Sequence, residues 1–215
     1  MSKGLMLHNI CILRNGLPLI EVNHEICAGD VLTVMGPSGV GKSTLLAYIT
    51  GNLPSVFKGM GKIFLDGEDV TNKPPHKRKI GILFQDDLLF PHMSVGTNLA
   101  FGMPSGGSKS QRRDMITSAL DDVDLKGFVD RDPATLSGGQ KARVALARML
   151  LSKPRALLLD EAFSRLDAEL RTQVRNLVFR VAKERELPVL MVTHDTEDAQ
   201  AANGNIIELK NLSSS

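Results

Sequence analysis

Short apolar runs alternate with stretches of helical periodicity along most of the chain. Four of these runs are apolar at successive positions, as expected for strands buried on both faces of a mostly parallel sheet. They are 30–36 (DVLTVMG), 79–85 (KIGILFQ), 155–161 (RALLLDE) and 188–195 (PVLMVTHD). Each run ends in small or polar residues, and open parallel sheets bind ligands beyond the carboxyl ends of their strands. The pattern therefore predicts an α/β fold with one shared site at that edge of the sheet.

Helical patterns lie between these runs. Lys42–Thr50 leads up to Gly51, a residue typical of a helix end. A second helix is predicted before Pro188 from apolar residues at helical spacing, namely Leu170, Val174, Leu177, Val178 and Val181. Residues 1–30 and 60–70 instead predict antiparallel strands, with turns at Asn15-Gly16 and Asp66-Gly67.

Mostly helical signals fill the long stretch between the second and third strands. It includes a loop at 104–111 (PSGGSKSQ), which we expect to be flexible. We predict one domain over 1–215, with a helical subdomain at about 88–150 inserted into a core of about 1–87 and 151–215. The terminal NLSSS is expected to be a loose end.

Composition and charge exclude several classes of protein. The 26 Lys and Arg residues against 24 Asp and Glu residues give a net charge of +2, which does not favour a nucleic-acid partner. No run approaches the roughly 20 apolar residues of a membrane span, and the N-terminus lacks the apolar core of a signal peptide. Cys11 and Cys27 lack metal-ligand spacing, which indicates a reducing compartment, and we expect both to be buried thiols.

The stretch GPSGVGKST at 36–44 fits the P-loop pattern G-x-x-x-x-G-K-[ST]. Backbone N–H groups of such a loop surround phosphate oxygens, Lys42 neutralises phosphate charge, and the Ser43 hydroxyl can hold Mg²⁺. The predicted strand before the loop and the helix after it supply the context that the motif requires. We therefore expect ATP to contact Gly36, Pro37, Ser38, Gly39, Gly41, Lys42, Ser43 and Thr44.

Polar residues at the other strand ends supply candidate catalytic groups. Asp160 is expected to hold Mg²⁺ through water, and Glu161 to orient or deprotonate an attacking water. Gln85 could bind a metal or position water, or could only cap its strand. His194 could bind a phosphate, or could be a structural histidine.

The stretch LSGGQ at 136–140 carries neither charge nor nucleophile. Ser137 can cap a following helix, where Gly138 and Gly139 would expose backbone N–H groups to an anion. From these residues alone, an anion site and an ordinary capped helix both remain open.

Six motifs together resemble the ABC ATPases, the nucleotide-binding subunits of ABC transporters. They are GPSGVGKST, ILFQ, LSGGQ, ALLLDE, FSRLD and VTHD, in the order and rough spacing of that family. The resemblance implies a P-loop NTPase (RecA-like) core with an antiparallel β subdomain and an inserted α-helical subdomain. It also implies ATP hydrolysis coupled to transmembrane transport.

The resemblance also implies roles for single residues. Two subunits, expected to be identical, would sandwich two ATP molecules head to tail, so that the signature loop of one subunit meets the ATP of the other. Gln85 would be the Q-loop residue and a metal ligand, Asp167 the D-loop aspartate, and His194 the switch histidine. The signature loop would comprise Leu136, Ser137, Gly138, Gly139 and Gln140.

The stretch FQDDLLFPHMSV resembles the Q-loop region of bacterial importer ATPases. By this resemblance, Asp86–Ser94 would contact permease subunits at the cytoplasmic face of the inner membrane, and a separate solute-binding protein would deliver the substrate. We expect no C-terminal regulatory domain. A lipoprotein-releasing or cell-division type ABC ATPase and, more remotely, a small P-loop kinase are the alternatives.

Two positions depart from the family pattern. Most of the family stacks adenine on an aromatic residue, but the first 47 residues contain no Phe, Tyr or Trp, so Arg14 or Leu13 is expected to take that place. Ala162 follows Glu161 where the family usually has proline, which predicts a less rigid loop.

Overall fold

The computed structural model describes residues 3–209, and the predicted loose end at 211–215 lies outside them. The chain divides into two units, which are described separately. The first comprises Met1–Ile80, Arg155–Glu161 and Val181–Ser215. The second comprises Gly81–Pro154 and Ala162–Arg180, and the predicted helical subdomain lies within it.

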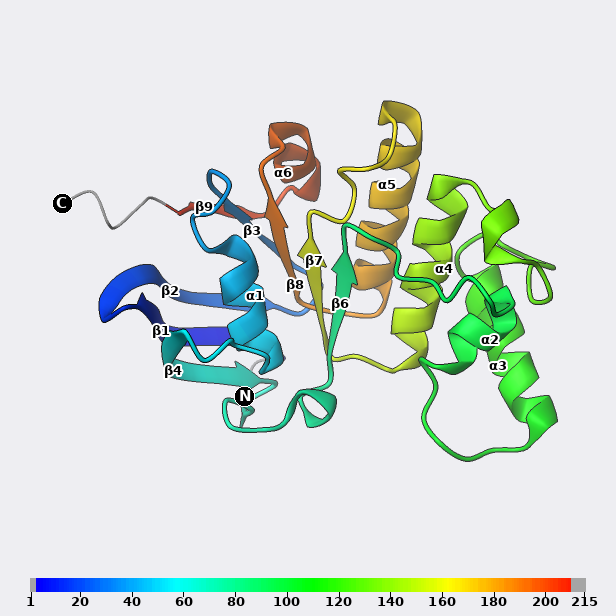
Figure 1. The fold of residues 1–215 in the computed structure, drawn as a ribbon, viewed down its shortest axis with the longest axis horizontal. Coiled ribbons are helices and arrows are strands. Elements are labelled where there is room, and N and C mark those ends of the chain that lie inside the picture. Colours follow the sequence, from blue (N-terminus) through cyan, green and yellow to red (C-terminus); the bar gives the residue numbers. More distant parts are fainter. Residues whose placement is uncertain (1–2, 210–215) are drawn as a thin grey trace. The chain divides into compact units, whose positions relative to one another are not determined.

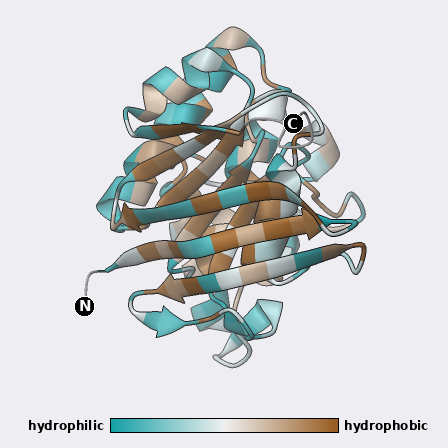
Figure 2. Ribbon diagram, turned by 90° about the vertical axis from the view of Figure 1, so that its left-hand side faces the viewer, coloured by the Kyte–Doolittle hydropathy of each residue, from teal (hydrophilic) through white to brown (hydrophobic). Residues whose placement is uncertain are grey.

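An antiparallel sheet in the first unit has the strand order β2-β1-β4-β5. Figure 2 shows its long strands banded by hydrophobic and hydrophilic residues. The two predicted turns are confirmed. Asn15 and Gly16 join β1 to β2 with φ values of 52° and 80°, and Asp66 and Gly67 join β4 to β5 with φ values of 49° and 79°. Positive φ at both central residues suits the right-handed twist of a tight hairpin. The strands are β1 (Gly4–Arg14), β2 (Leu17–Cys27), β4 (Phe57–Leu65) and β5 (Glu68–Asp69).

A bulge in β1 keeps its apolar residues on one face. Leu7 and Ile10 are both buried, although a regular strand would place residues three apart on opposite faces. The register shifts between them, and Asn9 has a φ of 48°.

The expectation of two buried thiols was wrong. Cys11 lies between the buried Ile10 and Ile12, so strand alternation turns its side chain to the outer face of the sheet, where it is half-buried. Cys27 is exposed at the end of β2, and both thiols are free.

Parallel strands of the first unit pair in the order β7-β8-β3-β9. Every residue of β8 is buried, as is all of β7 except Asp160, which confirms the predicted burial for these two strands. Burial is less complete in the other two, since both ends of the β3 run are half-buried and Phe84 of the run at 79–85 is exposed. Helices α1 (Lys42–Thr50) and α6 (Thr196–Ala202) contact this sheet (Figure 1). The strands are β3 (Val31–Met35), β7 (Ala156–Asp160), β8 (Val189–Thr193) and β9 (Asn205–Glu208). Strand β6 (Ile80–Phe84) leads from the first unit into the second.

Arg78 closes the end of the P-loop helix. It follows a short 3-10 helix (Pro75–Lys77), and its side chain is buried. Its guanidinium donates to the carbonyls of Tyr48 at 2.9 Å and Ile49 at 2.8 Å, in the last turn of α1. It also donates to the carbonyl of Lys73 at 2.8 Å. A cation at this end of a helix stabilises carbonyls that lack intrahelical donors.

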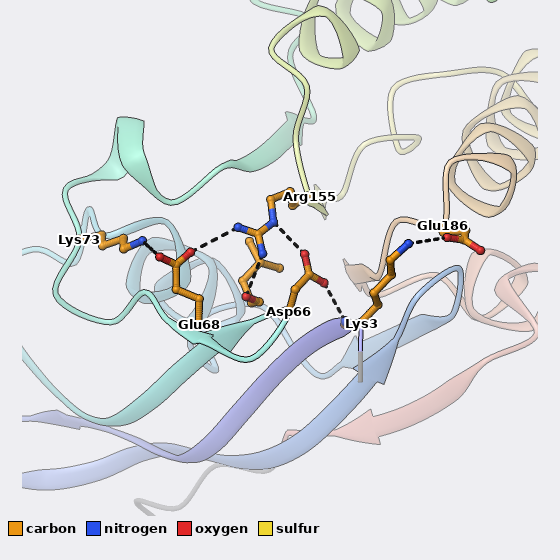
Figure 3. A network of polar contacts seen from close by, with 8 residues as sticks. Lys3, Asp66, Glu68, Lys73, Arg155 and Glu186 are labelled. Atoms are coloured by element: carbon orange, nitrogen blue, oxygen red, sulfur yellow. Dashed lines mark hydrogen bonds and ion pairs between the residues drawn. The ribbon is translucent and has the colours of Figure 1, made fainter. Parts of the chain in front are cut away.

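Arg155 links the β4–β5 hairpin to the start of β7 (Figure 3). Its Nε donates to Asp66 at 2.7 Å, and its other nitrogens donate to Glu68 at 3.3 Å and to the Leu65 carbonyl at 3.2 Å. Lys73 pairs with the same Glu68 and, by hydrogen bond and charge, lowers the pKa of this carboxyl. The network thus fixes the hairpin against the strand that leads to Asp160.

Helices form most of the second unit. They are α2 (Val95–Ala100), α3 (Lys109–Asp121), the 3-10 helix Pro133–Thr135, α4 (Gly138–Leu151) and α5 (Ala168–Glu184), of which α5 belongs to this unit as far as Arg180. Helix α3 begins within the predicted flexible loop at 104–111, so that prediction was wrong for its last three residues. The cause is a capping box, in which Ser108 and Gln111 bond to each other's backbone.

Candidate functional site

The loop at 36–44 joins the buried strand β3 to helix α1, as the P-loop motif requires. Gly41 immediately precedes the helix with a φ of 106°. A Cβ at this position would lie 2.7 Å from Cδ1 of Ile20 on β2. Both the backbone angle and the close approach therefore require glycine, and the first N–H groups of α1 stay open to an anion.

Lys42 is held within its own loop. Its side chain is only 6% exposed, and Nζ donates to the carbonyls of Gly36 at 2.8 Å and Pro37 at 3.2 Å. The same nitrogen lies 3.9 Å from Oε1 of Glu161. The cation is thus fixed between the loop and the end of β7, where phosphate charge would be neutralised.

Ser43 and Asp160 present two oxygen atoms side by side. The Ser43 hydroxyl donates to Oδ1 of Asp160 at 3.2 Å, although 117 residues separate them in sequence. Burial raises the pKa of Asp160, and the nearby Glu161 adds to this, while the Ser43 hydrogen bond and Lys42 oppose it. A half-buried carboxylate whose charged form is disfavoured would be stabilised by a nearby cation.

Glu161 and His194 meet across the ends of β7 and β8. Nδ1 of His194 lies 3.3 Å from Oε1 of Glu161. The Glu161 backbone N–H donates to the Val192 carbonyl at 3.0 Å, and its φ of 49° is left-handed, which costs a non-glycine residue about 1–3 kcal/mol. The strained backbone turns the carboxylate toward Lys42 and His194.

The signature loop forms the start of α4. Ser137 caps the helix, since its Oγ accepts from the Gln140 N–H at 3.3 Å and its own N–H donates to the Gln140 side chain at 3.0 Å. The predicted cap is therefore confirmed. Asp167 caps α5 in turn by accepting from the Leu170 N–H at 3.0 Å.

Comparison with known proteins identifies the family. The family model described as "ABC transporter" matches residues 19–164. An uncharacterized ABC transporter ATP-binding protein of Escherichia coli (strain K12), YnjD, is 48% identical over 183 residues, which cover 85% of this chain and 84% of that protein. The chain belongs to the ABC transporter ATP-binding proteins. It is an ATP-binding subunit of this class, with the ATPase activity that drives transport.

Other relatives of this ABC ATPase carry names that specify import. The Fe(3+) ions import ATP-binding protein FbpC of Escherichia coli O157:H7 is 43% identical over 87% of this chain and 53% of its own length. The spermidine/putrescine import ATP-binding protein PotA of Nitrosomonas europaea is 43% identical over 86% of this chain and 51% of its own length. The alignment thus spans about half of each of these two relatives.

A solved structure supports the fold assignment. CbiO1 from Clostridium perfringens, described as part of the ABC transporter complex cbiONQ, superposes with a TM-score of 0.85 at 29% identity. The superposition covers 98% of this chain and 86% of that chain. The predicted P-loop NTPase core of mixed α/β type, with one antiparallel and one parallel sheet, is therefore confirmed.

The ABC ATPase thus brings the P-loop, Asp160, Glu161 and His194 together in its first unit. Gln85, the signature loop and Asp167 belong to the second unit, so their approach to ATP stays a prediction. Arg14 lies exposed at the end of β1 and Leu13 is half-buried beside it, and both stay predicted adenine contacts.

Two residues of the second unit hold the segment 86–94 and were missed in the sequence. Asn98 is fully buried in α2 and bonds both the N–H and the carbonyl of Phe90. Arg148 of α4 donates to the carbonyls of Asp87 and Leu88. Both interrupt an otherwise apolar helical face, and a polar residue at such a position could have signalled a buried partner.

None of the helices formed by residues 3–209 is long and apolar enough to cross a membrane. Within the same residues, no cluster of three or more His, Cys, Asp or Glu side chains is arranged to hold a metal ion.

Proposed function

We propose that this ABC ATPase powers import of a solute through a separate membrane permease. The names of FbpC and PotA support import, and their similarity extends over 86% or more of this chain. The observation that supports the ATPase site is a pair of contacts at the end of β7: Ser43 donates a hydrogen bond to Asp160, and Lys42 lies within ion-pairing distance of Glu161. By analogy with the import class, a solute-binding protein delivers the substrate and the ATPase attaches to the cytoplasmic face of the inner membrane through its permease.

Magnesium fits the paired oxygens of Ser43 and Asp160. A hydroxyl and a carboxylate are the hard oxygen ligands that Mg²⁺ prefers, and the ion usually completes its shell with water and nucleotide phosphates. Gln85 would supply a further amide oxygen. The ion, when bound, neutralises the charge that develops on the γ-phosphate.

Glu161 is the proposed base. Its carboxylate accepts a proton from the attacking water, while Lys42 neutralises phosphate charge from the other side. His194 lies beside Glu161 and holds it in place through Nδ1, which leaves Nε2 to face the γ-phosphate. Ala162 in place of proline leaves the following loop less constrained.

A second copy of the chain is the proposed partner for the signature loop. Gly138 and Gly139 expose N–H groups at the positive end of α4, where they would bind the γ-phosphate of the other subunit's ATP. Asp167 would couple the two sites through the loop that it caps. Each ATP site then contains the P-loop of only one subunit, and so it needs only one lysine.

Apolar side chains on the segment 86–94 support a permease contact there. Leu88 is 57% exposed and Phe101 is 60% exposed, and the rings of Phe90 and Phe101 lie 4.8 Å apart. Exposed apolar side chains that gather in this way commonly mark a protein interaction site. We propose that a helix of the permease binds to this surface.

The experiment that tests the proposal is the solution mass of Glu161→Gln with and without Mg-ATP. This variant should bind ATP but hydrolyse it very slowly, so the ATP-bound dimer should accumulate. The mass should therefore double only when Mg-ATP is present. Adding Ser137→Arg should abolish the doubling, because the large arginine side chain would fill the space in which the signature loop meets the partner's phosphate. A monomer at saturating Mg-ATP, or turnover by Glu161→Gln at the wild-type rate, would contradict the assignment.

A further inference from the structure

We call the segment 86–94 the docking turn, and the side chain of Arg148 attaches it to α4. Nη1 of Arg148 donates to the Leu88 carbonyl at 2.8 Å, and Nη2 donates to the Asp87 carbonyl at 2.9 Å. Both acceptors are backbone atoms, so the attachment fixes the path of the chain itself. The carboxylate of Asp87 lies near the guanidinium and also near Lys141 on the same helix.

The other half of the docking turn is attached to α2. The Asn98 amide donates to the carbonyls of Phe90 at 3.1 Å, Met93 at 3.2 Å and Ser94 at 3.1 Å. The end of α2 also lies against α4, because a Cβ on Gly102 would be 1.9 Å from the Arg148 carbonyl oxygen. The docking turn therefore has little freedom to move independently of α4.

Helix α4 carries the signature loop at its other end. It begins at Gly138, directly after the Ser137 cap, and Arg148 lies ten residues later. That distance is about 15 Å of continuous helix. A displacement applied at Arg148 is therefore transmitted to the signature loop by one rigid element.

We propose that Arg148 is the positioning residue that couples the docking turn to the signature loop. Binding of the permease to the turn displaces α4 through the Asp87 and Leu88 carbonyls, and engagement of ATP by the signature loop displaces the turn in the opposite direction. This role rests on the proposed function, since it needs a signature loop that binds ATP.

The guanidinium is the chemical feature that matters. Its planar fork offers two donors in fixed geometry, which matches two successive carbonyls. Lysine keeps the charge but is a single point with a flexible stem. Arg148→Lys therefore removes the bridge while it preserves the charge beside Asp87.

The test is hydrogen exchange of the amides at 87–90 in Glu161→Gln, followed by mass spectrometry with and without Mg-ATP. We expect Mg-ATP to change exchange there when Arg148 is present. In Arg148→Lys, these amides should exchange about tenfold faster or more, since local opening is easier. They should also stop responding to Mg-ATP, although the mass still doubles. Arg148→Gln, which also lacks the fork, should behave in the same way.

Arg112 on α3 provides a matched control. It donates to the carbonyls of Pro104 at 2.8 Å, Gly106 at 3.2 Å and Ala100 at 3.3 Å, the last at the end of α2, and none of these acceptors lies in the docking turn. Arg112→Lys should change exchange around 100–107 and should leave the response to Mg-ATP at 87–90 intact. Asp87→Asn, which keeps both carbonyls, should retain the response to Mg-ATP.

Two results would overturn the inference alone: a normal response to Mg-ATP in Arg148→Lys, or loss of the response in Arg112→Lys. Failure of Glu161→Gln itself to form a dimer with Mg-ATP would overturn the proposed function and the inference together. The dimer mass thus distinguishes the two failures.

Discussion

Gly139 of the signature loop lies against Leu170 of α5 so closely that a Cβ on the glycine would be 3.0 Å from Cδ2 of the leucine. The neighbouring Gly138 has more room, since its nearest contact would be Leu166 Cδ2 at 3.6 Å. Leu166 and Leu170 flank Asp167 in sequence. The D-loop and the signature loop of one subunit are thus packed together.

This packing predicts that the two signature glycines differ. Gly138→Ala should be neutral or slightly stabilising, because alanine favours helix and the added methyl fits. Gly139→Ala should be less stable than Gly138→Ala by about 1 kcal/mol, because the methyl crowds Leu170. Urea unfolding of both variants measures the difference.

Leu170→Ala supplies the control for this prediction. In its presence, the difference between Gly138→Ala and Gly139→Ala should vanish, as a double-mutant cycle would show. A difference that persists without the leucine would place its cause elsewhere in α4.

Arg78 is predicted to dominate the stability of the P-loop helix. Arg78→Met should lower the free energy of unfolding by about 2–4 kcal/mol, because the carbonyls of Ile49 and Lys73 would lose the guanidinium donor and Tyr48 would keep only the Gly51 N–H. Lys77→Met, at the exposed neighbouring position, should change it by less than about 0.5 kcal/mol. Similar losses in both variants would contradict a specific cap.

Asp160 is predicted to make stability depend on pH in the absence of magnesium and nucleotide. Burial raises the pKa of Asp160, so the folded protein retains this proton at a pH where the unfolded chain has lost it. As pH rises above about 4, the wild type therefore loses stability from this group, and the loss is complete above the raised pKa.

The variant Asp160→Asn removes that loss while it can still accept the Ser43 hydrogen bond. Its melting temperature minus that of the wild type should be near zero at low pH and should increase toward neutral pH. Stabilisation by Mg-ATP should disappear in the variant. A difference in melting temperature that stays constant with pH would rule out Asp160 as the titrating group.

The hairpin end near Arg14 is predicted to bind adenine weakly. Aromatic stacking on a base contributes about 1–3 kcal/mol, and no Phe, Tyr or Trp precedes Tyr48. Leu13→Tyr or Arg14→Tyr should therefore tighten ATP binding within that range, as measured by calorimetry in the Glu161→Gln background. Lys62→Tyr on β4 is the control and should leave affinity unchanged. If neither hairpin variant binds ATP more tightly, the base lies elsewhere.

Local patterns were sufficient for the elements and for the nucleotide loop. Four apolar runs predicted four strands, and the Asn-Gly and Asp-Gly pairs predicted their turns, because these signals depend on neighbours in sequence. The same local logic failed at Cys11 and Cys27, where burial depends on which face of the sheet is covered. It also missed the start of α3, where Ser108 and Gln111 cap each other.

The sequence by itself determined the chemistry, since Lys42, Ser43, Asp160 and Glu161 lie in motifs that specify phosphate and metal binding. The tertiary structure alone decided which distant residues support that chemistry. Arg78 contacts the end of α1, Arg148 contacts the docking turn and Leu170 packs against Gly139, and all three act through backbone atoms or close packing. No sequence pattern identifies the partner in such a contact, because any element that arrives at the right place can supply it.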